Sequence, residues 1–415
     1  MRILEGSGKN RFVRALEQRG AADLAVVEPA VRRIVNDVRR NGDRAVRRYA
    51  ARWENLGKDE TLPVPEADLQ QAWERTPVEL RDAITQAAAN IRRYCEWQKP
   101  EEWQRDIHPG VHVGQLIRPL ESVGCYVPGG RYPLPSTLLM TVIPAQVAGV
   151  RQIRVASPRP AEITLAAAGF LGVHDFYRVG GAHAIAALAY GTETISRVHK
   201  IVGPGNKYVT AAKKLVAFDC AIEFLAGPTE AVFISDNGDP EYLAADLVAQ
   251  AEHDPDALCV LITPSRELAK KAQKEVRTRT RANPIARQSL SRRGAILLVA
   301  SFVEAIETSN RIAPEHLTLP AALAPAVRNA GSVFLDEFSP QAAGDYVSGP
   351  NHVLPTGGMA RVRGGLSVLD FVRVIACQRI SNEGIRRIGP AGVVLAEAEG
   401  LHGHAESLRV RCSHA

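Results

Sequence analysis

The chain has 415 residues, of which 46% are hydrophobic and 23% are charged, and its formal net charge is +6. This length allows two or three domains with buried cores, and this composition excludes an intrinsically disordered or low-complexity chain. Basic residues gather in 31–52 and 277–293, where aromatic residues are sparse, and acidic residues are interspersed in the first run. Solvated helix faces therefore explain the charge better than a nucleic-acid surface does.

Signals for export and membrane insertion are not expected in this sequence. The first 18 residues lack the apolar segment of a secretory signal, and the longest uncharged run, 132–150, is interrupted by three prolines. Six cysteines are scattered without close pairs, at Cys95, Cys125, Cys220, Cys259, Cys377 and Cys412. We therefore expect reduced thiols in a cytoplasmic protein.

The first quarter of the chain predicts a helical scaffold, because apolar residues recur at helical spacing in 26–52 and 77–97. From about residue 115, short β-branched runs alternate with helical patterns, which is typical of parallel βα units. The expected strands are 152–156, 175–179, 200–202, 231–235, 257–263, 295–299 and 331–335. The expected helices are 163–171, 182–190, 207–216, 266–280 and 302–311, and one that includes 246–253. Two doubly wound α/β halves are the simplest account.

Three glycine-bearing turns follow expected strands, with the sequences VPGG at 127–130, VGGA at 179–182 and VGPGN at 202–206. Such turns let backbone N–H groups approach a dinucleotide pyrophosphate, but none of them is a GxGxxG fingerprint, and ordinary tight turns remain an alternative. Tyr126 and Asn206 stand beside the first and third turns as candidate cofactor contacts. Cys125 could be a thiol nucleophile, although no neighbouring base or cation favours this over a buried structural cysteine.

A candidate metal site begins with Gln250 and His253, which stand three residues apart near the end of a helical pattern. That spacing places two side chains on one helix face, where an amide oxygen and an imidazole could meet one ion. Asp345 and His404, from a glycine-rich stretch and from the tail, would complete four nitrogen and oxygen donors of the kind zinc accepts.

Glu315 and His316 form a candidate acid–base pair beside a short β-like run. Adjacent residues of an extended segment face opposite sides, so both reach one substrate only if the backbone turns, which Pro314 permits. A carboxylate and an imidazole at one pocket can abstract protons and activate water near neutral pH, whereas a surface Glu–His pair is the alternative. His352 lies in the same glycine-rich stretch as Asp345, and Glu399 lies near His404.

Seven motifs of this sequence resemble those of the histidinol dehydrogenase family. They are GCYVPGGRYPLPST at 124–137, VGGAHAIAALAYG at 179–191, KIVGPGNKYV at 200–209, AGPTE at 226–230, DLVAQAEHDP at 246–255, APEHL at 313–317 and GDYVSGPNHVLPTGG at 344–358. The resemblance covers essentially the whole chain, and the order and spacing of the motifs are highly specific.

The resemblance implies an NAD-dependent, four-electron oxidation of L-histidinol through histidinal to L-histidine, the last steps of histidine biosynthesis. It implies one zinc per subunit, held by Gln250, His253, Asp345 and His404, that positions the substrate. His316 falls on the catalytic base, and Glu315 on the residue that activates water. The implied substrate contacts are these ligands and His316 together with Thr229, His352 and Glu399, and the implied NAD contacts are Tyr126, His183 and Asn206.

The resemblance also implies two incomplete Rossmann-like halves with small helical terminal extensions, and a homodimer with shared active sites. We expect an N-terminal extension in 1–22, and a first α/β domain in 23–125 plus 231–375 with most metal and catalytic residues. We expect a second α/β domain with the NAD-binding loops in 126–230, and a helical tail in 376–415 that packs on the partner subunit.

Three positions depart from the family pattern. His183 stands where a glutamine is expected to contact NAD, which changes the donor pattern and adds pH dependence. Thr229 replaces a serine but keeps the hydroxyl, and Gln341 stands where some members have glutamate.

Two other functions fit parts of this sequence. A paralogue of the same fold could keep zinc and base but oxidise another small polar alcohol; Glu399 beside His404 favours histidinol, because a carboxylate there can neutralise its amino group. A metal-stabilised nucleic-acid-binding protein would fit the basic charge, and it predicts strongly salt-dependent DNA binding.

Overall fold

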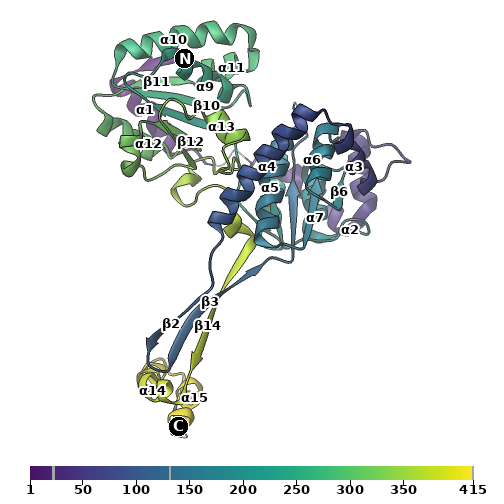
Figure 1. Ribbon diagram of the computed structural model, residues 1–415, viewed down its shortest axis with the longest axis vertical. Coiled ribbons are helices and arrows are strands. Elements are labelled where there is room, and N and C mark those ends of the chain that lie inside the picture. The colour runs from purple at the N-terminus through teal and green to yellow at the C-terminus, as the bar shows by residue number, and fades with distance from the viewer. Residues whose placement is uncertain (21–23, 130–131, 414–415) are drawn as a thin grey trace.

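The computed structural model describes residues 1–20, 24–129 and 132–413, which form two parallel α/β halves and a long ribbon ending in two helices (Figure 1). The five-stranded sheet has the order β6-β5-β4-β7-β8, and every pair in it is parallel. Its strands are β4 (Ser122–Tyr126), β5 (Gln152–Ala156), β6 (Asp175–Tyr177), β7 (Lys200–Val202) and β8 (Ala221–Ile222). The chain leaves β4 first to one side and later to the other, which creates a switch point between β4 and β7.

The six-stranded sheet repeats this topology, with the order β1-β11-β10-β9-β12-β13 and parallel pairing throughout. Its strands are β1 (Arg2–Leu4), β9 (Glu230–Ile234), β10 (Leu258–Thr263), β11 (Ala295–Leu298), β12 (His316–Leu319) and β13 (Ser332–Leu335). Its helices are α1 (Gly6–Glu17), α9 (Pro240–Ala251), α10 (Arg266–Arg279), α11 (Pro284–Arg292), α12 (Phe302–Ile312) and α13 (Gln341–Tyr346). The prediction of two doubly wound α/β halves is confirmed.

Seven helices of the described chain surround the five-stranded sheet. They are α2 (Glu28–Glu54), α3 (Glu66–Arg75), α4 (Val78–Gln98), α5 (Pro135–Ala148), α6 (Glu162–Phe170), α7 (Gly181–Tyr190) and α8 (Lys207–Val216). Short 3-10 helices occupy Thr280–Ala282, Ala321–Ala326, Met359–Arg361 and Val368–Phe371. None of the helices in the described ranges is long and apolar enough to cross a membrane.

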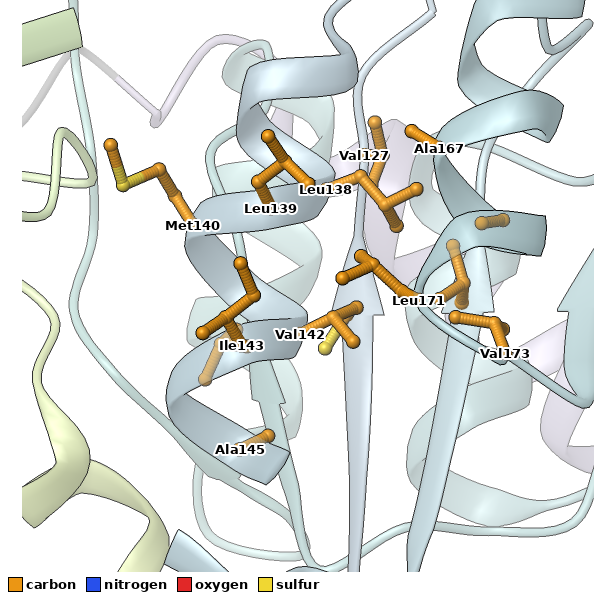
Figure 2. Packing of buried hydrophobic residues seen from close by; sticks show 14 of the residues in the cluster. Val127, Leu138, Leu139, Met140, Val142, Ile143, Ala145, Ala167, Leu171 and Val173 are labelled. Carbon is orange, nitrogen blue, oxygen red and sulfur yellow. The ribbon is translucent and has the colours of Figure 1, made fainter. Parts of the chain in front are cut away.

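Helix α5 is apolar on nearly all sides because it is buried on nearly all sides. Figure 2 shows Leu138 and Val142 of this helix pointing toward the neighbouring strand, while Met140 points to the opposite side; Val127, Ala167, Leu171 and Val173 belong to the neighbouring segments of the same cluster. Pro144 inside this helix cannot donate to the carbonyl of Met140 four residues earlier. Asn351 Nδ2 donates to that carbonyl at 2.6 Å, so a distant loop satisfies the group that the proline leaves free.

A three-stranded antiparallel ribbon carries the C-terminal helices away from both sheets (Figure 1). It consists of β2 (Trp103–His108), β3 (Val111–Pro119) and β14 (Val372–Ile380), and it ends in α14 (Asn382–Ala398) and α15 (His402–Ser413). The sequence-based prediction missed this ribbon, and the expected helical tail begins only at 382 because 376–380 belong to β14. Every residue of β2 is exposed, so no alternation of apolar residues marked it as a strand.

The predicted grouping of 23–125 with the six-stranded half is also wrong for the helices. Helix α2 packs on α7 and α8, α3 packs on α6, and α4 packs on α5. The buried face of α2 shares a hydrophobic cluster with α7 and α8. The described part of 1–22 is no separate extension, because β1 pairs with β11 and α1 packs on α12. Both misassignments concern long-range packing, which helical periodicity does not encode.

Candidate active site

Glu315 and His316 lie where β12 begins, at the amino edge of the six-stranded sheet. Ala313 ends α12 with a φ of +51°, and Pro314 follows it. Glu315 Oε2 accepts the N–H of Glu230 at 2.9 Å and lies 3.7 Å from His316 Nδ1. The backbone turn therefore brings together two side chains that a regular strand would separate.

Asp345 connects this pair to Gln250 and His352. Its Oδ1 lies 3.5 Å from His316 Nε2, and its Oδ2 accepts from Gln250 Nε2 at 3.1 Å. His352 Nδ1 donates to the Asp345 carbonyl at 2.8 Å, and His352 Nε2 lies 3.3 Å from Thr137 Oγ1. A side chain from α9, one from β12, one from α13 and one from the following loop thus meet at a single place.

The structure corrects the predicted position of His253 and defines the backbone that carries Asp345. Helix α9 ends at Ala251, so His253 lies beyond its last turn, and the two residues do not share a helix face. Gln250 is buried and His253 is exposed. Asp345, which the sequence places in a glycine-rich stretch, sits on the short helix α13, whose packing on α9 brings it to Gln250.

Burial and the attraction between opposite charges have opposing effects on the pKa values of Glu315, His316 and Asp345. Burial raises the pKa of Glu315 to about 8, although His316 acts against the shift. Burial acts to lower the pKa of His316, but the carboxylates of Glu315 and Asp345 outweigh it and raise that pKa overall. Burial acts to raise the pKa of Asp345, yet the bond from His316 lowers it overall. Neighbouring groups with separated pKa values are typical of acid–base sites.

The two tail residues lie far from this place in the same chain. Glu399 follows α14 and His404 lies in α15, and both are exposed at the end of the ribbon (Figure 1). Of the four expected metal ligands, His404 therefore lies apart from Gln250, His253 and Asp345 in this chain. Within the ranges that the structure describes, no three His, Cys, Asp or Glu side chains are grouped to hold a metal alone.

The expected cofactor residues lie at the carboxyl edge of the five-stranded sheet, beside its switch point. The Tyr126 hydroxyl accepts the N–H of Gly181 at 3.1 Å. Asn206 is exposed, and its side-chain oxygen caps α8 by accepting from Tyr208 N and Val209 N. His183 is 1% exposed and turned inward. Gly130 of the first glycine turn lies outside the described residues.

Comparisons with known proteins agree with this geometry. The histidinol dehydrogenase family model matches residues 17–412. The chain is 46% identical to the histidinol dehydrogenase of Methanothermobacter thermautotrophicus, over 97% of both proteins, and 47% identical to that of Haloarcula marismortui, over 94% of both. The crystal structure of histidinol dehydrogenase from Elizabethkingia anophelis superposes with a TM-score of 0.93 at 34% identity, covering 100% of this chain and 98% of that one.

The chain belongs to the histidinol dehydrogenase family. A histidinol dehydrogenase is an oxidoreductase of histidine biosynthesis that acts on an alcohol and an aldehyde. Thiol chemistry at Cys125 is not supported, because the side chain is fully buried and burial raises its pKa to about 12.

Sequence reasoning overlooked Glu230 as part of the candidate site. Its backbone N–H holds Glu315, and its carboxylate binds Arg19 through two contacts of 2.6 Å and accepts from Gly357 N at 3.0 Å. Its place directly after Thr229 in the AGPTE motif was the available signal. Gln341 is buried and donates to Thr318 Oγ1 at 3.0 Å, so its amide is used in packing α13 onto β12.

Proposed function

We propose that this chain oxidises L-histidinol through histidinal to L-histidine, with NAD as oxidant and one zinc per subunit. The observation that carries the proposal is the convergence of Glu315, His316, Asp345 and Gln250 at one buried place in a chain of this family. These residues come from three separate segments of the sequence, so their meeting depends on tertiary packing and not on local sequence.

The donors present fit zinc. Gln250, His253, Asp345 and His404 offer amide oxygen, imidazole nitrogen and carboxylate oxygen, which are ligand types that zinc accepts. When bound, zinc would fix the pose of the substrate, and two NAD molecules in turn would each take up one hydride. Thr229 lies directly before β9 and next to Glu230, and we assign it with His352 and Glu399 to substrate contact.

His316 acts as the base in both oxidations, and Glu315 activates the water that is added between them. His316 takes the proton of the alcohol as the first hydride leaves, and its contacts with two carboxylates stabilise the imidazolium that results. Glu315 then removes a proton from water as the water oxygen adds to the aldehyde carbon, and the His316 imidazolium returns its proton to the carbonyl oxygen, which gives the hydrate and leaves His316 neutral. His316 takes a hydroxyl proton of that hydrate as the second hydride leaves. Glu230 N–H orients Glu315 throughout.

A homodimer completes the proposed site. Glu399 and His404 lie in the helical region at the end of the ribbon, far from the site of their own chain, and we infer that they enter the site of a second subunit. Exposed apolar residues on the ribbon and tail, among them Ile375, Val394 and Leu395, provide surface for such a contact. We expect the dimer to work in the cytoplasm.

Product stoichiometry tests the function. Purified, zinc-loaded protein given L-histidinol and NAD should form two NADH for each histidine, measured by absorbance and amino-acid analysis. The related-alcohol alternative predicts faster turnover of other amino or sulfonated alcohols. Absence of NADH formation with zinc bound would refute the assignment.

A further inference from the structure

Both glycine turns that the structure describes in full have N–H groups already engaged by protein side chains. Glu223 Oε1 accepts from Gly203 N at 2.8 Å, and Glu54 Oε1 accepts from Gly180 N at 2.8 Å. The N–H of Gly181 donates to the Tyr126 hydroxyl. These groups are the ones expected to face a pyrophosphate, so the turns do not offer them to an anion.

Each of the two carboxylates is buried beside a basic partner. Lys213 donates to Glu223 Oε1 at 2.5 Å and to the carbonyl of Gly203 at 3.1 Å, with both side chains almost fully buried. His183 Nε2 lies 3.2 Å from Glu54 Oε1, with 1% and 7% of the two side chains exposed. The rings of Tyr49 and Trp53 pack around His183, and each ring centroid lies 5.7 Å from the centroid of the His183 ring. A buried carboxylate needs such a partner, because an unpaired charge would be costly there.

Tyr126 contacts both turns, through its hydroxyl at the N–H of Gly181 and through its carbonyl oxygen beside Gly203. Gly203 has a φ of +115°, and a Cβ on it would stand 2.0 Å from the Tyr126 carbonyl oxygen. A Cβ on Gly180 would stand 2.5 Å from Pro158. Both positions require glycine because neighbouring protein atoms leave no space for a side chain there. The carboxylates accept from the backbone of each turn and so hold it against these neighbours.

We propose that Glu54 with His183, and Glu223 with Lys213, are positioning residues that fix the two glycine turns on either side of Tyr126 and so preset the dinucleotide-binding edge. The proposal rests on the proposed use of NAD. It assigns His183 a role behind the binding edge instead of a direct cofactor contact. It also assigns the glycine N–H groups to these internal bonds instead of to the pyrophosphate.

Glu223→Ala and Glu54→Ala test the two positioning pairs in the zinc-loaded protein. Losing a charged hydrogen bond to a turn should weaken NADH binding on the order of tenfold, measured by fluorescence titration. The KM for NAD should rise in parallel, while the KM for L-histidinol and kcat at saturating NAD stay near wild type. Hydrogen–deuterium exchange should accelerate in peptides covering 180–184 or 203–209.

Two further variants separate positioning from general stability. Lys213→Met with Glu223→Gln removes both charges but keeps an oxygen that accepts from Gly203 N, and it should restore most of the NADH affinity. Lys9→Met with Glu304→Gln is the matched control, since Glu304 pairs with Lys9 and accepts from Ala300 N at 2.7 Å in the other half. It should leave NADH binding unchanged.

The NADH affinities of the variants decide whether the two pairs position the turns. Wild-type NADH affinity in both alanine variants would overturn the proposal, as would equal losses of NADH and histidinol binding. If Glu223→Ala does not fold, Glu54→Ala carries the test, and unchanged NADH binding in it overturns the proposal. A wild-type protein that binds no NADH overturns the proposed function as well, whereas unchanged variants of an active enzyme overturn this inference alone.

Discussion

A His253→Ala subunit paired with a His404→Ala subunit should have activity that neither variant has alone. The nine residues of β14 extend the ribbon by about 30 Å, at roughly 3.3 Å per residue, and place α15 beyond both sheets (Figure 1). His404 therefore cannot meet the Gln250, His253 and Asp345 of its own chain in this conformation. In a two-fold dimer, one site then combines the core of one subunit with the tail of the other.

The size of the effect follows from counting intact sites. Each variant homodimer lacks one metal ligand at both sites and should lose at least the roughly 10–100-fold that loss of supporting contacts alone costs. In the mixed dimer, one site carries both substitutions and the other carries neither. Purified mixed dimers should therefore show about half of the wild-type kcat per dimer.

Co-expression with two different affinity tags gives the mixed dimer, and NADH formation from L-histidinol gives its rate. Wild-type subunits carrying the same tags serve as the control for assembly. A mixed dimer as inactive as the two homodimers would show that the tail acts within its own chain, and would refute the reasoning from the ribbon.

Three further predictions concern chemistry and stability. His316→Asn should slow both oxidations, whereas Glu315→Gln should chiefly slow the step from histidinal to histidine; equal losses in single-turnover measurements of the two steps would contradict the assigned roles. Burial raises the pKa of Asp246 to about 6. The contribution of the protonated Asp246 side chain to the free energy of unfolding is therefore complete below about pH 4 and is lost as pH rises through 6. Asp246→Asn should then match wild type near pH 4 and, after discounting for solvent screening, be more stable by about 1–2 kcal/mol at pH 8 in denaturant unfolding. Asn351→Ala should cost about 1–3 kcal/mol of unfolding free energy by orphaning the Met140 carbonyl, and an unchanged midpoint would show that this bond contributes nothing.

Local sequence was sufficient to predict several elements at their observed bounds. Strands β5 and β7 and helix α8 agree with the prediction, and Asn206 caps α8 with its side chain. Short buried strands are marked by continuous β-branched runs, and helix starts are marked by capping residues, so both signals lie within a few neighbouring residues. The end of α9 was misjudged because the helical spacing of Gln250 and His253 continues past Ala251.

For the candidate site, too, the sequence predicted the residue types but not how they come together. The residue types at Glu315, His316, Asp345 and His253 indicated acid–base and metal chemistry, and the resemblance to a family named their roles. Their meeting depends on the packing of α13 on α9 and on the turn before β12, which no local pattern states. The inward orientation of His183 depends equally on Glu54, which lies 129 positions earlier in the chain.

The sequence by itself determined the α/β class, the order of most strands and helices in the two α/β halves, and the candidate residues, because periodicity and residue type are local properties. Only the tertiary structure decided which half the N-terminal helices cover, how the ribbon extends, and which glycine N–H groups are already occupied. These depend on contacts between segments far apart in the chain, whose free energy comes from burial and pairing that exist only after folding.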